Sequence, residues 1–356
     1  MRVLTVIGNR PQFVKAAAVS GPLREQAEEV LVHTGQHYDD ELSRVFFDEL
    51  GLPRPEHRLD LGGGSNTAQT ARMLVAVEAL LADERPDVVL VYGDTNSTLA
   101  GALAAAQARI PVAHVEAGMR SFDMRMPEEL NRVLTDHASS LLLCPSPAAA
   151  ENLRAERVHG EVLVCGDVMV DVASMVGPAA ASRTDVPTAH GVTAGGYLLV
   201  TAHRAGNVDE PSRLAALVEL LLALPEPVVL PLHPRTRARL ESSGGLDALS
   251  SAPHLHLTPP LGYLEFTALV RQARRVLTDS GGVQKEAYLA GVPCVTLRDS
   301  TEWVETVDAG WNVLVDLGLP AALAAIERPA PVAHPALYGD GRAGVRVVEA
   351  LLRMAG

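Results

Sequence analysis

Residues 88–107 read VVLVYGDTNSTLAGALAAAQ and contain the pattern that decides the fold. The first five residues are apolar, which indicates a strand of a parallel sheet that is covered on both faces. Gly93 and Asp94 form a turn, and the Ala- and Leu-rich segment after them indicates a helix. This order of strand, turn and helix is the building unit of a doubly wound α/β sheet.

The same unit recurs along the chain, and a shift in composition divides the recurrence into two halves. Residues 174–196 are rich in Ala, Gly, Pro, Ser and Thr, which predicts a link between domains. The chain has 356 residues, enough for two domains. We predict Rossmann-like α/β domains over residues 1–172 and 173–341 that face each other across a cleft, and a C-terminal helix over residues 342–356. The predicted strands are residues 3–7, 30–33, 88–92, 112–116, 141–144, 162–165, 198–201, 228–232, 255–257, 276–278, 294–297 and 313–315.

Composition excludes several classes of protein. Hydrophobic residues make up 47% of the chain and charged residues 21%, which excludes a disordered protein. The 43 acidic residues outnumber the 30 basic ones, which argues against nucleic acid as a partner. No segment has the length and apolarity of a membrane span or a signal peptide, so we expect no membrane partner and a cytoplasmic location. Cys144, Cys165 and Cys294 lack metal-ligand spacing and are interpreted as core thiols.

Charged residues follow the first strands, at the sheet edge where ligands bind in open α/β folds. Arg10 and Lys15 flank the start of a helix, which indicates either an anion site or two solvated surface charges. Asp94 follows the strand at residues 88–92 and is either a helix N-cap or an acid–base group. The residues alone leave both pairs of alternatives open.

Three carboxylates and two arginines cluster after the strand that ends in Glu116. Carboxylates held close together separate in pKa, as acid–base chemistry requires. We therefore predict acid–base roles for Glu116 and Glu128, whereas Glu129 is interpreted as part of a solvated surface. The arginines of the cluster are Arg120 and Arg132.

The second half has its own set of polar strand ends. His203 and His233 follow two strands at equivalent places, as packed side chains or as site residues. Residues 278–287, TDSGGVQKEA, join a strand to a helix start, whose N–H groups would hold a diphosphate together with the Ser280 hydroxyl. Glu286, one helical turn on, would accept hydrogen bonds from ribose hydroxyls. The chain has neither a dinucleotide fingerprint, nor a Walker loop, nor a metal-ligand motif, so we expect no cofactor and no metal.

Taken together, these stretches resemble the non-hydrolysing UDP-N-acetylglucosamine 2-epimerases. The resemblance runs in order over nearly the whole chain. It implies a GT-B-like fold in which the second domain holds most of the UDP and the C-terminal helix crosses back to the first domain. We also expect a homodimer. The matching stretches are residues 8–11, 33–37, 92–95, 114–118, 127–132, 278–282 with Glu286, 301–302 and 338–341.

The resemblance implies a reaction that inverts the carbon bearing the acetamido group, interconverting UDP-N-acetylglucosamine and UDP-N-acetylmannosamine. UDP is eliminated to leave a 2-acetamidoglucal, and it is then added back after a proton returns to the opposite face. Positioned acid–base groups typically contribute about 10²–10⁴-fold each to such a reaction. By position, the resemblance assigns acid–base roles to Asp94, Glu116 and Glu128 and assistance of UDP departure to His203. It assigns UDP binding to Ser280, Gly281, Gly282, Glu286 and Arg298, with Phe266 near the uracil. Arg10 and Lys15 are the predicted cations for the departing diphosphate, and Arg132 and His233 are further candidates for binding the substrate.

The chain departs from the commonest family pattern in two places. Residues 301–305 read TEWVE instead of TERPE, and residues 38–41 read YDDE instead of an Arg-rich stretch. That stretch helps many bacterial members to bind a second, activating UDP-N-acetylglucosamine, so the resemblance does not extend to this activation. The departures resemble a subgroup that includes archaeal-type epimerases and relatives acting on UDP-2,3-diacetamido-glucuronate. A uronate carboxylate would need an extra cation, for which Arg120, Arg125 and Arg132 are the candidates.

Four other functions remain open from the residues. They are a 2-epimerase of UDP-2,3-diacetamido-2,3-dideoxyglucuronate, a hydrolysing epimerase that releases N-acetylmannosamine, a GT-B glycosyltransferase and a non-catalytic UDP-sugar-binding protein. The cluster of Asp94, Glu116 and Glu128 favours an epimerase over the last two, because neither a glycosyltransferase nor a sensor needs three carboxylates.

Overall fold

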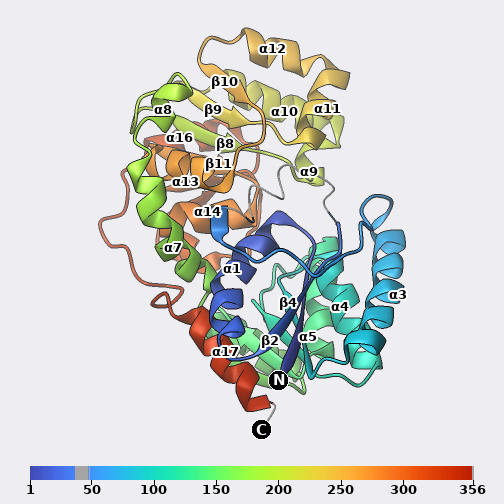
Figure 1. The fold of residues 1–356 in the computed structure, drawn as a ribbon. Helices are drawn as coiled ribbons and strands as arrows, with labels where there is room; N and C mark the ends of the chain where they lie inside the picture. The colour runs from blue at the N-terminus through green and yellow to red at the C-terminus, as the bar shows by residue number, and fades with distance from the viewer. Residues whose placement is uncertain (37–46, 48, 355–356) are drawn as a thin grey trace. The chain divides into compact units, whose positions relative to one another are not determined.

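The computed structural model describes residues 1–36, 47 and 49–354, and these form two compact units (Figure 1). The first unit consists of residues 1–175 and 338–356, and the second of residues 176–337. Each unit contains a parallel sheet whose strands alternate with helices, so the predicted α/β class is confirmed. Among the described residues, no helix is long and apolar enough to cross a membrane.

The sheet of the first unit has seven strands in the order β3-β2-β1-β4-β5-β6-β7. The chain proceeds outward from β1 in one direction and then continues from β4 in the other. Ligands bind at such a reversal, beyond the carboxyl ends of the strands. The short strand β3 was not predicted because two residues carry no periodic signal. The strands are β1 (Arg2–Ile7), β2 (Glu28–His33), β3 (His57–Arg58), β4 (Val88–Tyr92), β5 (Val112–Val115), β6 (Leu141–Cys144) and β7 (Glu161–Val164).

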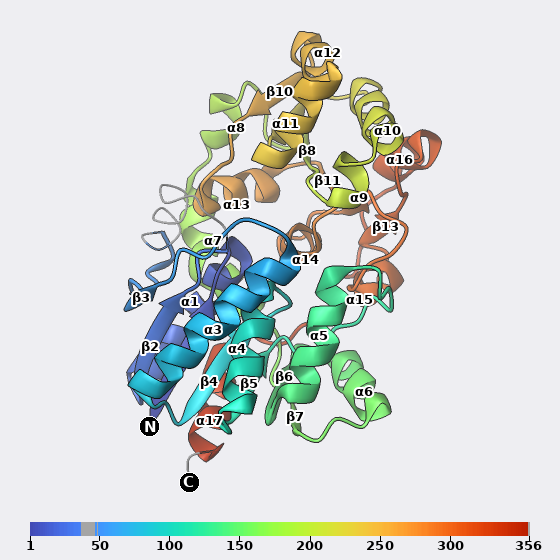
Figure 2. The ribbon, with the colours of Figure 1, turned by 90° about the vertical axis from the view of Figure 1, so that its right-hand side faces the viewer.

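Helices α3 (Asn66–Glu84) and α4 (Asn96–Gln107) lie side by side against the first sheet (Figure 2). Val77 of α3 and Ala102 of α4 are fully buried in one apolar cluster with Val6 of β1, which holds these layers together. The other helices of this unit are α1 (Arg10–Arg24), α5 (Pro127–Ala138), α6 (Pro147–Glu156) and α17 (Ala343–Met354), together with the first half of α7 (Val168–Ser182), inside which the boundary between the units falls.

The C-terminal helix α17 packs on α1 of the first unit (Figure 1). The two backbones approach so closely that a Cβ atom on Gly344 would lie 2.1 Å from the carbonyl oxygen of Ala18. The carboxylate of Asp171 accepts hydrogen bonds from the N–H groups of Ala343 and Gly344 at 3.1 and 2.9 Å. These contacts attach helix α17 to α1, near the N-terminus, and to Asp171 of α7.

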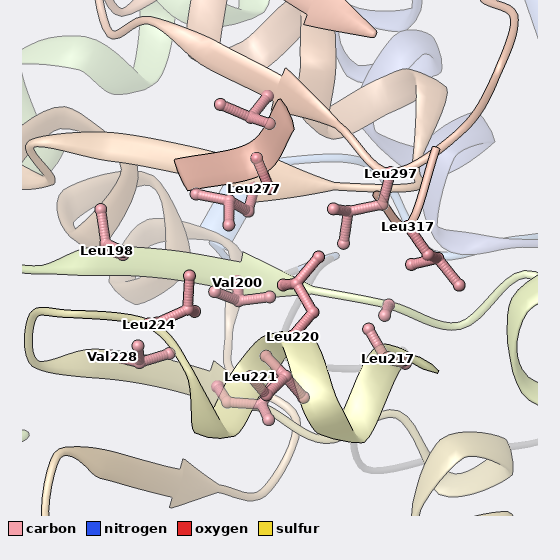
Figure 3. Close-up of a cluster of buried hydrophobic side chains, with 14 of the residues drawn as sticks. Leu198, Val200, Leu217, Leu220, Leu221, Leu224, Val228, Leu277, Leu297 and Leu317 are labelled. Carbon is pink, nitrogen blue, oxygen red and sulfur yellow. The ribbon is translucent and has the colours of Figure 1, made fainter. Parts of the chain in front are cut away.

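The sheet of the second unit has six strands in the order β10-β9-β8-β11-β12-β13, and its reversal lies between β8 and β11. Figure 3 shows the core beneath it, where Val200 of β8 meets Leu217 and Leu220 of α10. The strands are β8 (Leu198–Thr201), β9 (Val228–Pro231), β10 (Leu255–Thr258), β11 (Arg275–Thr278), β12 (Cys294–Thr296) and β13 (Asn312–Leu314). The helices are α8 (Val186–Ala189), α9 (Ala205–Val208), α10 (Pro211–Leu222), α11 (Pro234–Ser243), α12 (Gly245–Ser251), α13 (Tyr263–Gln272), α14 (Gly281–Leu289), α15 (Val304–Asp308) and α16 (Leu319–Glu327).

Two local predictions need correction. The segment at residues 174–196 contains the boundary between the two units, but it is helical over much of its length rather than an extended link, because α7 continues to Ser182 and α8 follows it. Its alanines favour a helix, and Pro178 is accommodated inside α7. The strand predicted to include Glu116 ends one residue earlier, at Val115.

Candidate functional site

The turn after β4 presents Asp94 without using it as a helix cap. Thr95 is the N-cap of α4, because its hydroxyl accepts the N–H of Thr98 at 3.4 Å and its own N–H donates to the Thr98 hydroxyl at 3.1 Å. The capping alternative for Asp94 is therefore wrong. The Asp94 carboxylate instead lies 2.5 Å from Nη2 of Arg132. The amide of Asn131 donates to the Asp94 carbonyl oxygen at 3.0 Å and fixes the turn.

Glu116 directly follows β5 in a strained backbone conformation. Its φ of 72° lies in the left-handed region, which costs a non-glycine residue on the order of 1–3 kcal/mol. The Glu116 carboxylate forms an ion pair with the Nζ of Lys15 from α1. Gly93 lies against this pair, since a Cβ there would be 3.1 Å from Lys15 Nζ and 3.3 Å from Glu116 Oε2. Helix α1 and the turns after β4 and β5 thus meet at one place.

Lys15 is the cation of this cluster. Burial alone would lower its pKa, but the charges of Glu116 and Asp94 outweigh burial and raise the pKa above its ordinary value. The side chain therefore stays an ammonium group near two predicted acid–base carboxylates. The interpretation of Lys15 as a solvated surface charge is wrong, because only 12% of its side chain is exposed.

Gln12 is a structural link that the sequence analysis missed. Its side chain is buried, and its Oε1 accepts the N–H of Gly8 at 2.7 Å. Its Nε2 donates to the Tyr92 carbonyl and to the Thr98 hydroxyl, both at 2.9 Å. This one amide joins the turn after β1 to the end of β4 and the start of α4. No local pattern distinguishes such a glutamine from a solvated one.

Helix α5 turns polar side chains inward. Its buried residues are Glu129, Asn131, Arg132, Thr135 and Asp136, whereas Leu130 and Leu134 are exposed. The assignment of Glu129 to a solvated surface is thus wrong, since its carboxylate accepts hydrogen bonds from Arg132 at 2.7 Å and from the Ser121 N–H at 3.0 Å. Burial raises the pKa of Glu129, but these donors outweigh burial and lower it overall.

Arg10 and Glu128 complete the predicted set of the first unit. Both are half-buried, Arg10 as the first residue of α1 and Glu128 in the first turn of α5. The Glu128 side chain makes no hydrogen bond or ion pair with any described residue. The structure thus brings Lys15, Glu116, Asp94 and Arg132 together, whereas Glu128 keeps its carboxylate available.

In the second unit, the turn between β11 and α14 leaves open space at the start of a helix. Ser280 precedes α14 but makes no capping hydrogen bond with its side chain, so its hydroxyl is not used by the helix. A Cβ on Gly282 would meet only the Ser280 Oγ, at 3.9 Å, so the protein itself does not fill the space there. The free N–H groups at the start of α14 suit an anion.

His203 and His233 stack on each other, with their ring centroids 5.3 Å apart. The buried carboxylate of Asp279, at the end of β11, accepts the backbone N–H of His203 at 3.1 Å and that of Arg204 at 3.0 Å. Asp279 therefore sets the course of the turn that bears His203. The ring of His233 also caps α11, because its Nδ1 accepts the Arg235 N–H at 3.2 Å.

The remaining candidates of the second unit already have partners. Glu286 is hydrogen-bonded to the buried Tyr263, and burial together with the Glu286 charge raises the pKa of Tyr263 well above its ordinary value. Phe266 is half-buried against an apolar cluster. Arg298 is bound through both Nη atoms to Glu302, at 3.0 and 3.2 Å.

One of the two departures from the commonest family pattern, Trp303, contacts a charged side chain. Trp303 stands where the commoner pattern has arginine, and the Nζ of Lys285 lies 3.3 Å from the centroid of its ring. Lys285 is almost fully buried, so the aromatic face replaces the water that its charge would otherwise bind. The other departure, at residues 38–41, and the matching His37 lie outside the described residues.

No group of three metal-ligating side chains occurs in the part of the chain that the structure describes.

Comparisons with known proteins agree on one family. A family model described as UDP-N-acetylglucosamine 2-epimerase matches residues 22–352. A UDP-N-acetylglucosamine 2-epimerase homolog of Methanococcus maripaludis is 45% identical, and 99% of each chain is covered. The UDP-2,3-diacetamido-2,3-dideoxy-D-glucuronate 2-epimerase of Pseudomonas aeruginosa is 46% identical over 99% of this chain and 100% of its own. The crystal structure of Methanocaldococcus jannaschii UDP-GlcNAc 2-epimerase in complex with UDP-GlcNAc and UDP matches with a TM-score of 0.93 and 39% identity, covering 99% of this chain and 100% of that one.

Proposed function

The chain belongs to the UDP-N-acetylglucosamine 2-epimerase family, and from this membership we propose that it interconverts UDP-N-acetylglucosamine and UDP-N-acetylmannosamine. The resemblance drawn from its motifs is thereby confirmed, and the protein is an enzyme of the isomerase class. The proposal concerns its substrate, its reaction course and the residues that act.

The observation that carries the proposal is the cluster of carboxylates in the first unit. Asp94 and Glu116 follow neighbouring strands and pair with Arg132 and Lys15. Glu128 lies in the first turn of α5, and its side chain makes no ion pair with the other described residues. Inversion at a C–H centre needs one group to remove a proton from one face and another to deliver a proton to the opposite face. This cluster supplies carboxylates for both tasks.

The reaction begins when the bond between the anomeric carbon and UDP breaks. Positive charge develops on the ring and acidifies the neighbouring C–H, whose proton passes to a carboxylate. The leaving diphosphate is stabilised by N–H groups at the start of α14, by the Ser280 hydroxyl and by His203. Return of a proton to the opposite face and re-addition of UDP complete the inversion. Glu286 holds the ribose, and Phe266 lies near the uracil.

The charges of the first unit favour a sugar without a carboxylate. The three arginines considered for a uronate already face protein carboxylates, because Arg120 pairs with Asp136 and Glu156 at 2.8 and 2.7 Å. Arg132 pairs with Asp94 and Glu129, and Arg125 pairs with Asp123. The second candidate substrate is UDP-2,3-diacetamido-2,3-dideoxyglucuronate, which the 46% identity to the Pseudomonas aeruginosa enzyme favours.

One experiment tests both candidates. The protein is incubated with each UDP-sugar in D₂O, and the products are followed by NMR. We expect UDP-N-acetylmannosamine with deuterium at C2 from UDP-N-acetylglucosamine, because the glycal takes its proton from a group that exchanges with solvent.

Four other results would overturn the proposal. Turnover of the uronate alone would establish the second candidate, and release of free N-acetylmannosamine would indicate a hydrolysing enzyme. Complete retention of protium would support oxidation and internal hydride return. Binding of both sugars without turnover would indicate a sensor.

A further inference from the structure

A group of charged residues that the proposed chemistry does not use lies buried behind the acid–base carboxylates. His114 of β5 and Asp136 of α5 are fully buried, and Arg120 is 4% exposed. Burying charges away from water is unfavourable unless they are paired and hydrogen-bonded. The arrangement therefore calls for an explanation beyond packing.

The contacts of His114 determine where its protons lie. Its Nε2 is 2.7 Å from the carbonyl oxygen of Gly93, and its Nδ1 is 2.7 Å from Oδ1 of Asp136. A carbonyl oxygen only accepts hydrogen bonds, so Nε2 must carry a proton. A neutral imidazole has only one N–H, so the protonation state of Asp136 decides whether Nδ1 carries a second proton.

Asp136 is surrounded by donors. Its Oδ2 accepts the N–H of Gly118 at 3.1 Å and faces Nη1 of Arg120 at 2.8 Å. Burial alone would raise the pKa of Asp136, but His114 and Arg120 outweigh burial and lower it. The carboxylate is therefore ionised and can only accept, which places a proton on Nδ1 of His114 as well.

The local charges balance around this doubly protonated ring. The cations His114 and Arg120 face the anions Asp136 and Glu156, since Arg120 binds Glu156 through Nε and Nη2, both at 2.7 Å. Two further titratable neighbours are His137, 3.5 Å from Glu156, and the thiol of Cys144 on β6. Burial and, to a lesser extent, the charge of Asp136 raise the pKa of Cys144. A balanced, fully hydrogen-bonded set is the condition under which buried ions persist.

The pair holds both turns that bear acid–base candidates. Gly93, whose carbonyl receives the His114 proton, directly precedes Asp94, and Gly118, whose N–H binds Asp136, follows Glu116 by two residues. Between them lies Glu116, whose positive φ is strained for a non-glycine residue and persists only where the surrounding structure holds it in place.

We propose that His114 and Asp136 form a buried imidazolium–carboxylate pair that positions Asp94 and Glu116 for proton transfer. The proposal rests on the proposed function, because it assumes that these two carboxylates act on the sugar. Neither member of the pair touches the substrate, so both are positioning residues. A neutral histidine cannot serve, since it has only one N–H for two acceptors.

The first test measures the ring directly and needs no substrate. The intact protein is labelled with ¹⁵N-histidine, and the His114 signals are assigned by their loss in His114→Asn. We expect both ring nitrogens of His114 to show protonated shifts at about pH 8, where an ordinary histidine is mostly neutral. One protonated and one unprotonated nitrogen would overturn the proposal, whatever the substrate proves to be.

The second test separates positioning from folding and binding. In His114→Gln and Asp136→Asn we expect kcat to fall roughly 10- to 100-fold, the cost of a small misplacement of reacting groups. KM should stay within about threefold, because the lost interaction serves the transition state. His137→Gln is the matched control, since His137 is on the same helix, is 44% exposed and lies 3.5 Å from Glu156.

Unchanged kcat in both variants would overturn the positioning role, as would an equal loss of kcat in His137→Gln. Should His114→Gln fail to fold, Asp136→Asn, which preserves side-chain size, carries the kinetic test. If no UDP-sugar is turned over by the unaltered protein, the proposed function fails, and the ring measurement still decides the charge of the pair.

Discussion

At the scale of single residues, the acid–base candidates are held by partners far away in the sequence. Lys15 pairs with Glu116, and Arg132 pairs with Asp94. The strained backbone of Glu116 shows that the fold tolerates a local cost to aim this side chain. Replacement of such a carboxylate by its amide keeps the shape of the side chain and removes its ability to take up a proton.

We therefore expect Asp94→Asn and Glu116→Gln each to lower kcat by at least about 10²-fold. Circular dichroism should show that both variants remain folded. Glu151→Gln is the control, because Glu151 is a carboxylate of the same unit whose side chain is 73% exposed on α6. Near-normal turnover in either site variant would assign that residue a structural role instead.

Substitution of the adjacent residues Glu128 and Glu129 should affect different properties, namely turnover for Glu128 and stability for Glu129. Glu129→Gln should reduce the free energy of unfolding by about 2 kcal/mol, because it weakens buried, charge-assisted hydrogen bonds to Arg132 and Ser121. Glu128→Gln should change stability by less than about 0.5 kcal/mol and lower kcat by at least about 10²-fold. Urea unfolding and turnover assays on both variants check this pair. A destabilised Glu128→Gln with normal turnover would reverse the assignment.

At the scale of elements, helix α5 reverses the usual arrangement of an amphipathic helix. Its charged residues face inward and hold the loops of the site, while Leu130 and Leu134 remain 44% and 40% exposed. Helix α17 shows a different use of close packing, because Gly344 allows its backbone to reach Ala18 of α1. In both helices, contacts with a neighbouring element determine which side chain a position can accommodate.

The contact between α17 and α1 predicts opposite effects of one substitution at two glycines. Gly344→Ala should destabilise the protein by about 1–3 kcal/mol, because its Cβ would lie 2.1 Å from the Ala18 carbonyl oxygen and the helices must separate. Gly21→Ala in α1 meets nothing within 4 Å. It should therefore stabilise the helix by up to about 1 kcal/mol. Thermal unfolding of both variants shows whether each substitution lowers or raises stability. Equal effects of the two substitutions would contradict the close contact between α17 and α1.

At the scale of the whole molecule, buried carboxylates make the first unit sensitive to acid. The pKa values of Glu129 and Asp136 are lower in the folded state than in the unfolded chain. Such groups contribute stability above their unfolded pKa of about 4 and lose it as the pH falls through the folded value. Asp171 opposes them, because burial raises its pKa. Glu129 and Asp136, whose contribution to stability is lost at low pH, both lie in the first unit.

We expect the first unit to unfold before the second as the pH falls from about 5 to about 3. Both tryptophans, Trp303 and Trp311, belong to the second unit, so their fluorescence reports on that unit alone. In urea at low pH, circular dichroism should therefore show an early transition that fluorescence lacks. Glu129→Gln should make the stability of the first unit less dependent on pH in this range. An earlier transition in fluorescence would contradict the assignment.

The α/β architecture, the division into two halves and the family can all be predicted from the amino-acid sequence. These features rest on local patterns: apolar runs form covered strands, and glycine-containing turns place polar residues at strand ends. Asp94, Glu116 and Ser280 could therefore be singled out before any contact was known. The family motifs added candidates such as Phe266 and Arg298, for which the local pattern alone gives no signal.

Which charged side chains face inward, and which partners they have, depends on contacts between segments that are distant in the sequence. Local periodicity assigns a charged or polar helix residue to solvent, whereas Glu129, Asp136 and Gln12 are all buried. The pairings of Lys15 with Glu116 and of Arg132 with Asp94 join segments up to 101 residues apart. Similarly, Thr95 rather than Asp94 caps α4, and the Asp94 carboxylate pairs with Arg132. Such choices depend on the balance between desolvation and pairing in the folded chain, and that balance has no signature in the neighbouring sequence.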